Sequence, residues 1–179
     1  MNFVKGGVAA LLCGAALIIL QACSPGNSAA AGKCPRIGVL PDAADYPVKD
    51  GNGKVLALAR LSLTNSACIY NKSNTAETGF SNVSFSLTVR VAAALSQGSR
   101  ISRIAAPYVI ATVAPDGVIT GRQEYTMDVD VSGRTGTEDE RVTINIPYQG
   151  GGDAAGHRVV VAFKLDEATV RLNRSRLGR

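Results

Sequence analysis

Residues 84–91 read Ser-Phe-Ser-Leu-Thr-Val-Arg-Val, in which every second side chain is apolar. Phe85, Leu87, Val89 and Val91 therefore point to one side of an extended chain, and the polar residues between them point to the other. This period of two predicts a β-strand with one face in a hydrophobic core and the other in water. A helix would instead need apolar positions three and four residues apart.

The same kind of pattern recurs along the chain and predicts seven strands. Apolar runs or alternating rows cover residues 36–40, 55–64, 84–91, 107–114, 125–131, 142–148 and 159–165. The tetrapeptide Ala114-Pro115-Asp116-Gly117 predicts a tight turn, because proline presets one φ and glycine accepts a positive φ. Seven strands at these intervals predict an all-β antiparallel sandwich with an immunoglobulin-like or fibronectin-III-like order. The Cys-Trp-Cys pattern of true immunoglobulin domains is absent, so this likeness concerns architecture alone.

The remaining segments predict loops, a bulge and one helix. Residues 42–54 contain Pro47, Gly51 and Gly53 and predict a loop, and residues 71–81 are polar and rich in turn formers. A one-residue shift in the alternation near Arg60 indicates a β-bulge. Asp166 and Glu167 predict the start of a short helix over residues 168–176, acidic at its beginning and basic at its end.

Composition limits the classes of protein to which this chain can belong. Its 179 residues suffice for one domain, and 46% hydrophobic with 18% charged residues excludes wholesale disorder. No apolar run reaches the roughly 18–20 residues of a membrane-spanning helix. One histidine and four scattered cysteines argue against a zinc site, and we expect no metal and no cofactor.

The first 23 residues form a pattern of their own. Lys5 precedes a continuous apolar run over residues 8–20, which ends at Leu20-Gln21-Ala22-Cys23. This arrangement resembles the signal peptide and lipobox of bacterial lipoproteins. The resemblance implies that residues 1–22 are removed and that Cys23 receives a diacylglyceryl thioether and an N-acyl chain such as palmitate. An ordinary cleaved signal or a short hydrophobic anchor are the alternatives.

The resemblance also implies a place in the cell. Ser24, rather than Asp, follows the lipidated cysteine, and this favours the outer membrane, with the protein facing the periplasm. Small and polar residues 24–33 predict a flexible tether, so that residues 23–33 form the lipidated linker with a root-mean-square reach of about 17 Å. Residues 34–179 then form the β-sandwich domain.

The domain itself is similar to small lipoproteins of alphaproteobacteria. The features that carry this resemblance are Cys34-Pro35-Arg36, Cys68-Ile69-Tyr70, the turn at residues 114–117, and the apolar strand at residues 158–165 that precedes the terminal helix. The resemblance covers most of the domain and implies no particular activity.

Cys34 and Cys68 predict a disulfide. Cys13 leaves with the signal peptide and Cys23 carries lipid, so an even pair remains for an oxidising compartment. Redox chemistry is the alternative, but the sequence has no Cys-x-x-Cys spacing to support it.

Basic residues gather at the end of the chain. Arg171, Arg174, Arg176 and Arg179 are candidates for contact with an anionic surface such as lipid phosphates or an acidic partner. The alternative is a solvated helix face with cations at the favourable end of the helix dipole. Export and the lack of an aromatic-basic motif argue against nucleic-acid binding.

Candidate chemical groups mostly have simpler explanations. His157, the one histidine, would have to serve in any Ser-His-Asp arrangement, but it follows a glycine-rich loop and is expected to be solvent-exposed. Asp50-Gly51-Asn52-Gly53 is similar to the start of a calcium loop but lacks the later oxygen ligands. Asp128 and Asp130 share a polar strand face, and residues 138–140 predict a solvated acidic loop.

These observations lead to one expected function and one alternative. We expect a membrane-anchored, non-enzymatic lipoprotein that binds an envelope protein or takes part in envelope assembly, with the bilayer as its second partner through Cys23. Peptidoglycan or polysaccharide binding is the alternative. It would normally require exposed aromatic platforms, whereas aromatic residues make up only 5% of the chain and Trp is absent.

Overall fold

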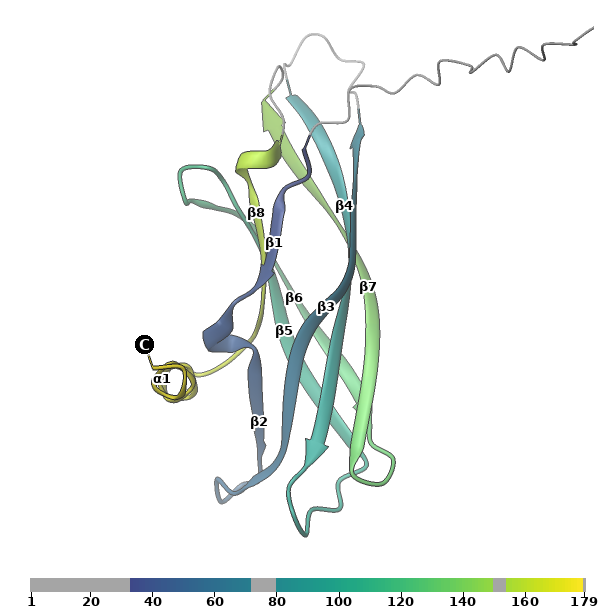
Figure 1. Cartoon of the computed structure of the whole chain (residues 1–179), viewed down its shortest axis with the longest axis vertical. Coiled ribbons are helices and arrows are strands. Elements are labelled where there is room, and N and C mark those ends of the chain that lie inside the picture. The colour runs from purple at the N-terminus through teal and green to yellow at the C-terminus, as the bar shows by residue number, and fades with distance from the viewer. Residues whose placement is uncertain (1–32, 72–79, 150–153, 179) are drawn as a thin grey trace, which may run out of the picture. The chain divides into compact units, whose positions relative to one another are not determined.

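The computed structural model describes residues 33–71, 80–149 and 154–178, and within them the chain forms a two-sheet β-sandwich with one terminal helix (Figure 1). The all-β fold class is therefore confirmed. The strands are β1 (Arg36–Val39), β2 (Asp45–Lys49), β3 (Val55–Asn71), β4 (Phe80–Leu95), β5 (Arg103–Val113), β6 (Ile119–Asp130), β7 (Thr135–Gln149) and β8 (Arg158–Phe163). The helical elements are η1 (Pro41–Ala43), η2 (Ala154–Gly156) and α1 (Glu167–Arg176).

Each sheet contains four strands. One sheet, called sheet A, has the order β1-β8-β5-β6, and the other, sheet B, has the order β2-β3-β4-β7. β1 runs parallel to β8, and every other pairing is antiparallel. Three consecutive strands, β2, β3 and β4, lie side by side in sheet B. This connection order differs from the ABED sheet of immunoglobulin domains, so the likeness is limited to the layered architecture.

An eighth strand lies where the sequence predicted a loop. β2 occupies residues 45–49, inside the segment 42–54, and pairs with β3 from Asp45 opposite Arg60 to Lys49 opposite Val55. The loop prediction was wrong here because Pro47 lies in a strand at the edge of sheet B. Proline is tolerated in an edge strand, where its missing N–H interrupts no second ladder.

The predicted bulge exists, but it lies beyond Arg60. The register between β3 and β4 shifts between Leu63 and Asn65, so Thr64 has no partner of its own. Before the shift Ala59 and Leu61 face the core, and after it Cys68 and Tyr70 do. Because the bulge reverses the parity, β3 continues to Asn71 instead of ending at residue 64, where the apolar pattern fades.

The predicted alternation is confirmed in the other strands. The inward rows of β4, β5, β7 and β8 are buried, and Phe85, Leu87 and Tyr108 are among the largest fully buried side chains. The predicted turn between β5 and β6 is also present. Gly117 has a φ of +89° there, and the Asp116 carboxylate accepts a hydrogen bond from the Val118 N–H at 3.0 Å.

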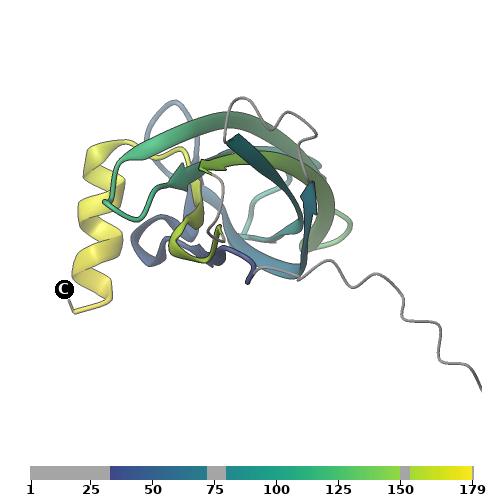
Figure 2. The ribbon, with the colours of Figure 1, turned by 90° about the horizontal axis from the view of Figure 1, so that it is seen from above.

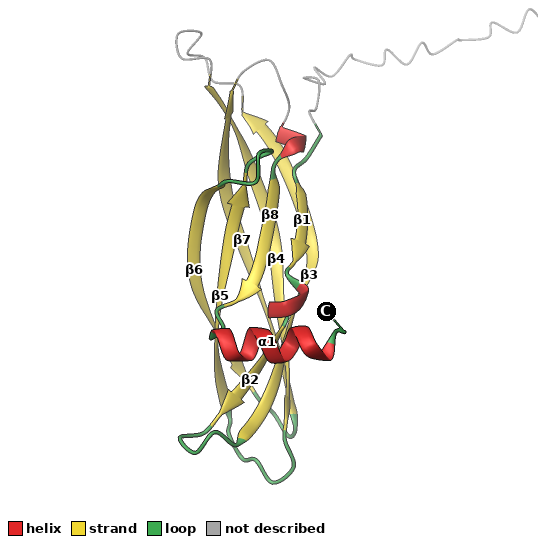
Figure 3. Ribbon diagram, turned by 90° about the vertical axis from the view of Figure 1, so that its left-hand side faces the viewer, coloured by secondary structure: helices red, strands yellow, loops and turns green. Residues whose placement is uncertain are grey.

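The chain leaves sheet A after β8 and passes directly to α1 (Figure 3). The Lys164 N–H donates to the Pro107 carbonyl at 2.9 Å, but proline has no N–H to donate in return. The ladder between β5 and β8 ends there, and α1 begins three residues later at Glu167. The helix prediction is confirmed, and Asp166 caps it by accepting from the Thr169 N–H at 2.6 Å.

Candidate interaction surfaces

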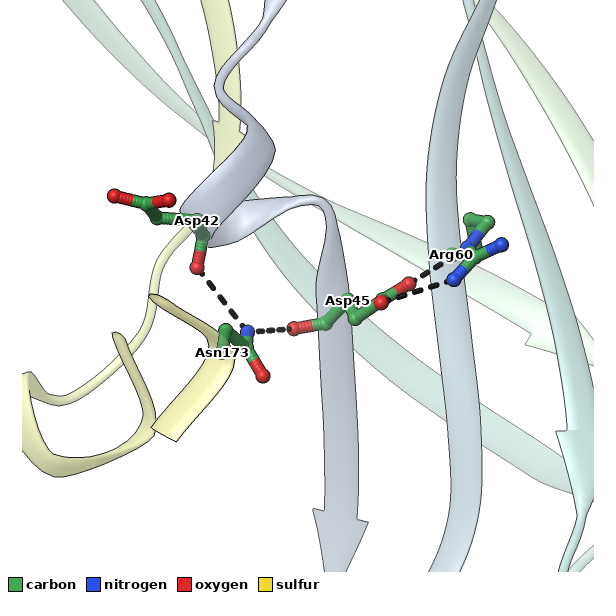
Figure 4. A network of polar contacts seen from close by, with 4 residues as sticks. All are labelled: Asp42, Asp45, Arg60 and Asn173. Carbon is green, nitrogen blue, oxygen red and sulfur yellow. Dashed lines mark hydrogen bonds and ion pairs between the residues drawn. The ribbon is translucent and has the colours of Figure 1, made fainter. Parts of the chain in front are cut away.

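Helix α1 fastens one flank of the sandwich, where the chain crosses from β1 to β2 (Figure 4). The buried side-chain amide of Asn173 donates to the carbonyls of Asp42 and Asp45 at 3.1 and 3.0 Å. The Asp45 carboxylate in turn forms a bidentate pair with Arg60, with distances of 2.7 and 3.0 Å. Helix, crossover and β3 are thus joined in one polar network, which closes the flank between the short edges β1 and β2.

The network also accounts for part of the terminal arginine cluster. Arg174 pairs with the Asp42 carboxylate at 2.9 Å, and Arg171 pairs with Glu167 one helical turn away at 2.6 Å. Arg176 is exposed near the end of the helix, and Arg179 lies outside the described residues. Two of the four predicted anion-contacting arginines are therefore engaged by carboxylates of the chain itself.

The chain enters the domain at a covalently fixed point. The predicted disulfide between Cys34 and Cys68 is confirmed, with 5.8 Å between the two Cα atoms. It joins the segment before β1 to strand β3 of the other sheet. The Tyr70 hydroxyl adds to this by donating to the Lys33 carbonyl and accepting from the Ala154 N–H. Cys23, the predicted lipid site, lies outside the described residues.

His157 is not placed as a catalytic base. It is half-buried between η2 and β8, not exposed as predicted, and its carbonyl accepts the Arg36 N–H at 3.2 Å just before β8 begins. Its ring Nδ1 is buried and has no hydrogen-bond partner among the described residues. Within residues 33–71, 80–149 and 154–178, the imidazole Nδ1 therefore has no carboxylate partner of the kind that a Ser-His-Asp arrangement uses.

Residues 50–53 form a turn. The Asp50 carboxylate accepts hydrogen bonds from the N–H groups of Asn52 and Lys54 at 2.9 and 3.0 Å, and Gly53 has a φ of +81°. Asp50 thus closes the turn between β2 and β3. In the described part of the chain, no group of three or more His, Cys, Asp or Glu side chains could hold a metal ion.

The acidic residues on β6 and β7 have specific partners. Asp130 pairs with Arg103 at 2.9 Å, while Asp128 lies exposed on the same face. The prediction of an acidic loop at residues 138–140 was wrong, because these residues lie inside β7. Asp139 forms a bidentate pair with Arg90 there, and this guanidinium lowers the pKa of the carboxyl.

Glu140 makes the contact that the sequence analysis missed. Its carboxylate accepts a hydrogen bond at 2.7 Å from the hydroxyl of Tyr108, which stacks on Tyr125 with 5.1 Å between ring centroids. Burial raises the pKa of Tyr108 above its ordinary value of 10, and the bond to Glu140 adds to this shift. The signal was present in the sequence, because Glu140 has the same parity as the inward residues Val142 and Ile144.

The flank formed by β6 and β7 is the open side of the sandwich (Figure 3). Among the described strands, β6 pairs with β5 alone and β7 with β4 alone, over 12 and 15 residues respectively. The opposite edges, β1 and β2, have only four and five residues, and beyond Arg60 strand β3 pairs with β4 alone. Residues 119–124 of β6 are exposed on both faces, and the side chain of Ile119 is 62% accessible. Long edges of this kind can accept a strand from another chain.

Seen from above, α1 lies at one side of the sandwich, next to the crossover from β1 to β2 (Figure 2). The β6 and β7 edges approach each other at the turn between them, where a Cβ on Gly136 would lie 2.3 Å from the Asp130 carbonyl oxygen. Only glycine fits this close approach of the two sheets.

Comparisons with known proteins do not assign the chain to a family. No family model matches the sequence, and no curated protein and no solved structure matches it. Within the described ranges, none of the helices has the length and apolar character required to cross a bilayer.

Proposed function

We propose that this chain is a non-enzymatic lipoprotein of the outer membrane that faces the periplasm and binds an envelope protein at the β6/β7 flank. The observation that carries the proposal is the 12-residue edge of β6, which has one strand neighbour and is exposed on both faces over its first half. A partner strand added there would form a main-chain ladder, and the exposed side chains would supply specificity.

The fixed entry point supports a tethered module. The disulfide at Cys34 fixes the point at which the predicted linker of residues 23–33 would join the sandwich. With a reach of about 17 Å the linker keeps the domain next to the membrane surface. More than one acyl chain on Cys23 would make such anchoring stable.

Sugar binding remains the second candidate, and the geometry favours it less. Every aromatic side chain that the structure describes is buried or half-buried, including Tyr46, which packs on Phe163 with 5.4 Å between ring centroids. The described surface therefore offers no flat aromatic platform on which a sugar ring could stack.

Site-specific photocrosslinking in cells tests the protein partner. A photoreactive residue at Gln123 lies on the open edge, and a matched one at the exposed Leu58 lies where β3 is paired with both β2 and β4. We expect a discrete envelope protein to be captured from Gln123 and not from Leu58. Equal capture at both positions would contradict the proposed flank, and retention of the protein by purified sacculi alone would favour sugar binding.

Intact mass of the membrane-extracted protein tests the anchor. We expect the mass of residues 23–179 plus a diacylglyceryl group and an N-acyl chain. A full-length mass without lipid, or a cleaved chain without acyl groups, would contradict the lipoprotein assignment.

A further inference from the structure

Two arginines lie directly opposite each other on the outer face of sheet A. Arg36 on β1 is the register partner of Arg158 on β8, and both side chains are exposed. Neither side chain forms an ion pair with any residue in the ranges 33–71, 80–149 and 154–178. Like charges opposite each other on a sheet are unfavourable, so an anion placed between them would be stabilising.

An apolar hollow adjoins the two arginines on the same face. It has a volume of about 230 Å³ and is lined by Gly38, Leu40, Pro41 and Val160 together with the arginines. The hollow exists because Gly38 has no side chain and nothing lies within 4 Å of the place where its Cβ would be. Leu40 is 45% exposed at its rim.

The apolar character extends across the sheet. Arg158 pairs with Val113, and Val113 pairs with the exposed Ile119, so a row from cationic to apolar side chains crosses all four strands. The row lies at the end where the chain enters, because β1 begins two residues after Cys34. A cationic and apolar face next to a lipidated linker matches the chemistry of an anionic bilayer surface.

We propose that this face of sheet A rests on the membrane that holds the acyl chains of Cys23, with Arg36 and Arg158 against lipid phosphates. The inference rests on the proposed lipid anchor. The tether raises the effective concentration of the lipid surface, so two cations and a few apolar side chains suffice for contact. The β6/β7 flank would then remain accessible to a protein partner.

Strand addition is a poor explanation for this face. β1 is only four residues long, and Pro35 and Pro41 stand at its two sides. A ladder with a partner strand would therefore be short, and it would leave the opposed arginines without a counterion.

A tryptophan reporter tests the contact, because the chain contains no Trp. The full acylated protein carrying L40W is reconstituted in vesicles of phosphatidylcholine and phosphatidylglycerol whose acyl chains are brominated. The matched reporter is I69W, which replaces an exposed apolar residue on the outer face of sheet B near the same end of the sandwich. We expect at least twofold stronger quenching of L40W than of I69W.

The charge requirement is tested in the same assay. We expect R36Q/R158Q to lower the quenching of L40W to the level of I69W, since each arginine contributes about fivefold to the association with an anionic surface. The control K54Q/R100Q removes two exposed charges from turns outside this face and should leave the quenching unchanged. Circular dichroism of each variant verifies that the sandwich is folded.

Two outcomes overturn the inference. Equal quenching of L40W and I69W shows that the face does not lie on the bilayer, and quenching that persists in R36Q/R158Q shows that the arginines do not mediate it. Intact mass on the same preparation reports the anchor separately. An acylated protein with equal quenching leaves the proposed function standing, whereas a protein without acyl chains overturns both.

Discussion

The hydroxyl of Tyr108, from the interior of sheet A, donates a 2.7 Å hydrogen bond to Glu140 on β7, the edge strand of sheet B. This bond joins the two sheets at the open flank. On the other flank, Asn173 of α1 donates hydrogen bonds to the crossover from β1 to β2 and so holds the helix against the sandwich. The sandwich therefore has one flank closed by a helix, and a second flank where this hydrogen bond between the sheets lies beside two long edges.

Replacing Tyr108 by Phe should destabilise the domain by about 1–2 kcal/mol, because the half-buried Glu140 carboxylate loses its donor. Urea unfolding at neutral pH measures the change. Tyr125→Phe is the control, since its hydroxyl bonds to Gln123 on its own strand, and should cost less. An equal loss of unfolding free energy in the two variants would show that the hydrogen bond between the sheets adds no more stability than the bond within β6.

Removing the disulfide should have the largest effect on stability. Cys34 and Cys68 are 34 residues apart, and opening a loop of this length costs about 4 kcal/mol in the chain-entropy model. We expect Cys34→Ser/Cys68→Ser to lower the urea midpoint strongly, and the wild-type protein to behave similarly after reduction. An unchanged midpoint under reducing conditions would mean that the bond adds no stability.

The terminal helix should depend on Asn173 more than on its arginines. Asn173→Ala removes two hydrogen bonds to the crossover and leaves two carbonyls unpaired, which should cost about 1–3 kcal/mol. Arg171→Ala removes an exposed pair and should cost less than about 0.5 kcal/mol. Thermal unfolding followed by circular dichroism compares the two, and a larger loss for Arg171→Ala would contradict this assignment.

Acid should weaken the start of the helix through Asp166. The hydrogen bonds from Thr169 lower the pKa of this carboxyl below its ordinary value of 3.8. A lowered folded-state pKa gives a contribution to stability that is full above the unfolded value and is lost as the pH falls through the folded value.

Asp166→Asn keeps an oxygen for the cap without the titrating charge. We therefore expect this variant to lose less stability than the wild type between pH 6 and pH 2, as measured by urea unfolding at each pH. An identical pH dependence of the unfolding free energy in the two proteins would show that another group causes the loss of stability at low pH.

Local patterns predicted most of the strands and the helix. The alternation at residues 84–91, the Pro-Asp-Gly turn and the capping Asp166 all act through neighbours a few residues away, and the structure has each of them. The disulfide was also predicted, because the expected signal peptide and lipid site account for Cys13 and Cys23 and leave one pair. An alternating pattern predicts which side chains of a strand are buried, whichever residues lie on the other side of the core.

The tertiary structure decided the features that depend on distant partners. β2 is a strand because the edge of β3 accepts it, and the position of the predicted bulge, at Thr64, becomes visible only against β4. The partner of the inward-facing Glu140 is Tyr108 of the other sheet, and Arg36 meets Arg158 only through parallel pairing of the first and last strands. Long-range register creates these contacts, and periodicity within a segment carries no information about it. The sequence by itself determined the layers of the sandwich, and packing between remote segments determined its flanks and faces.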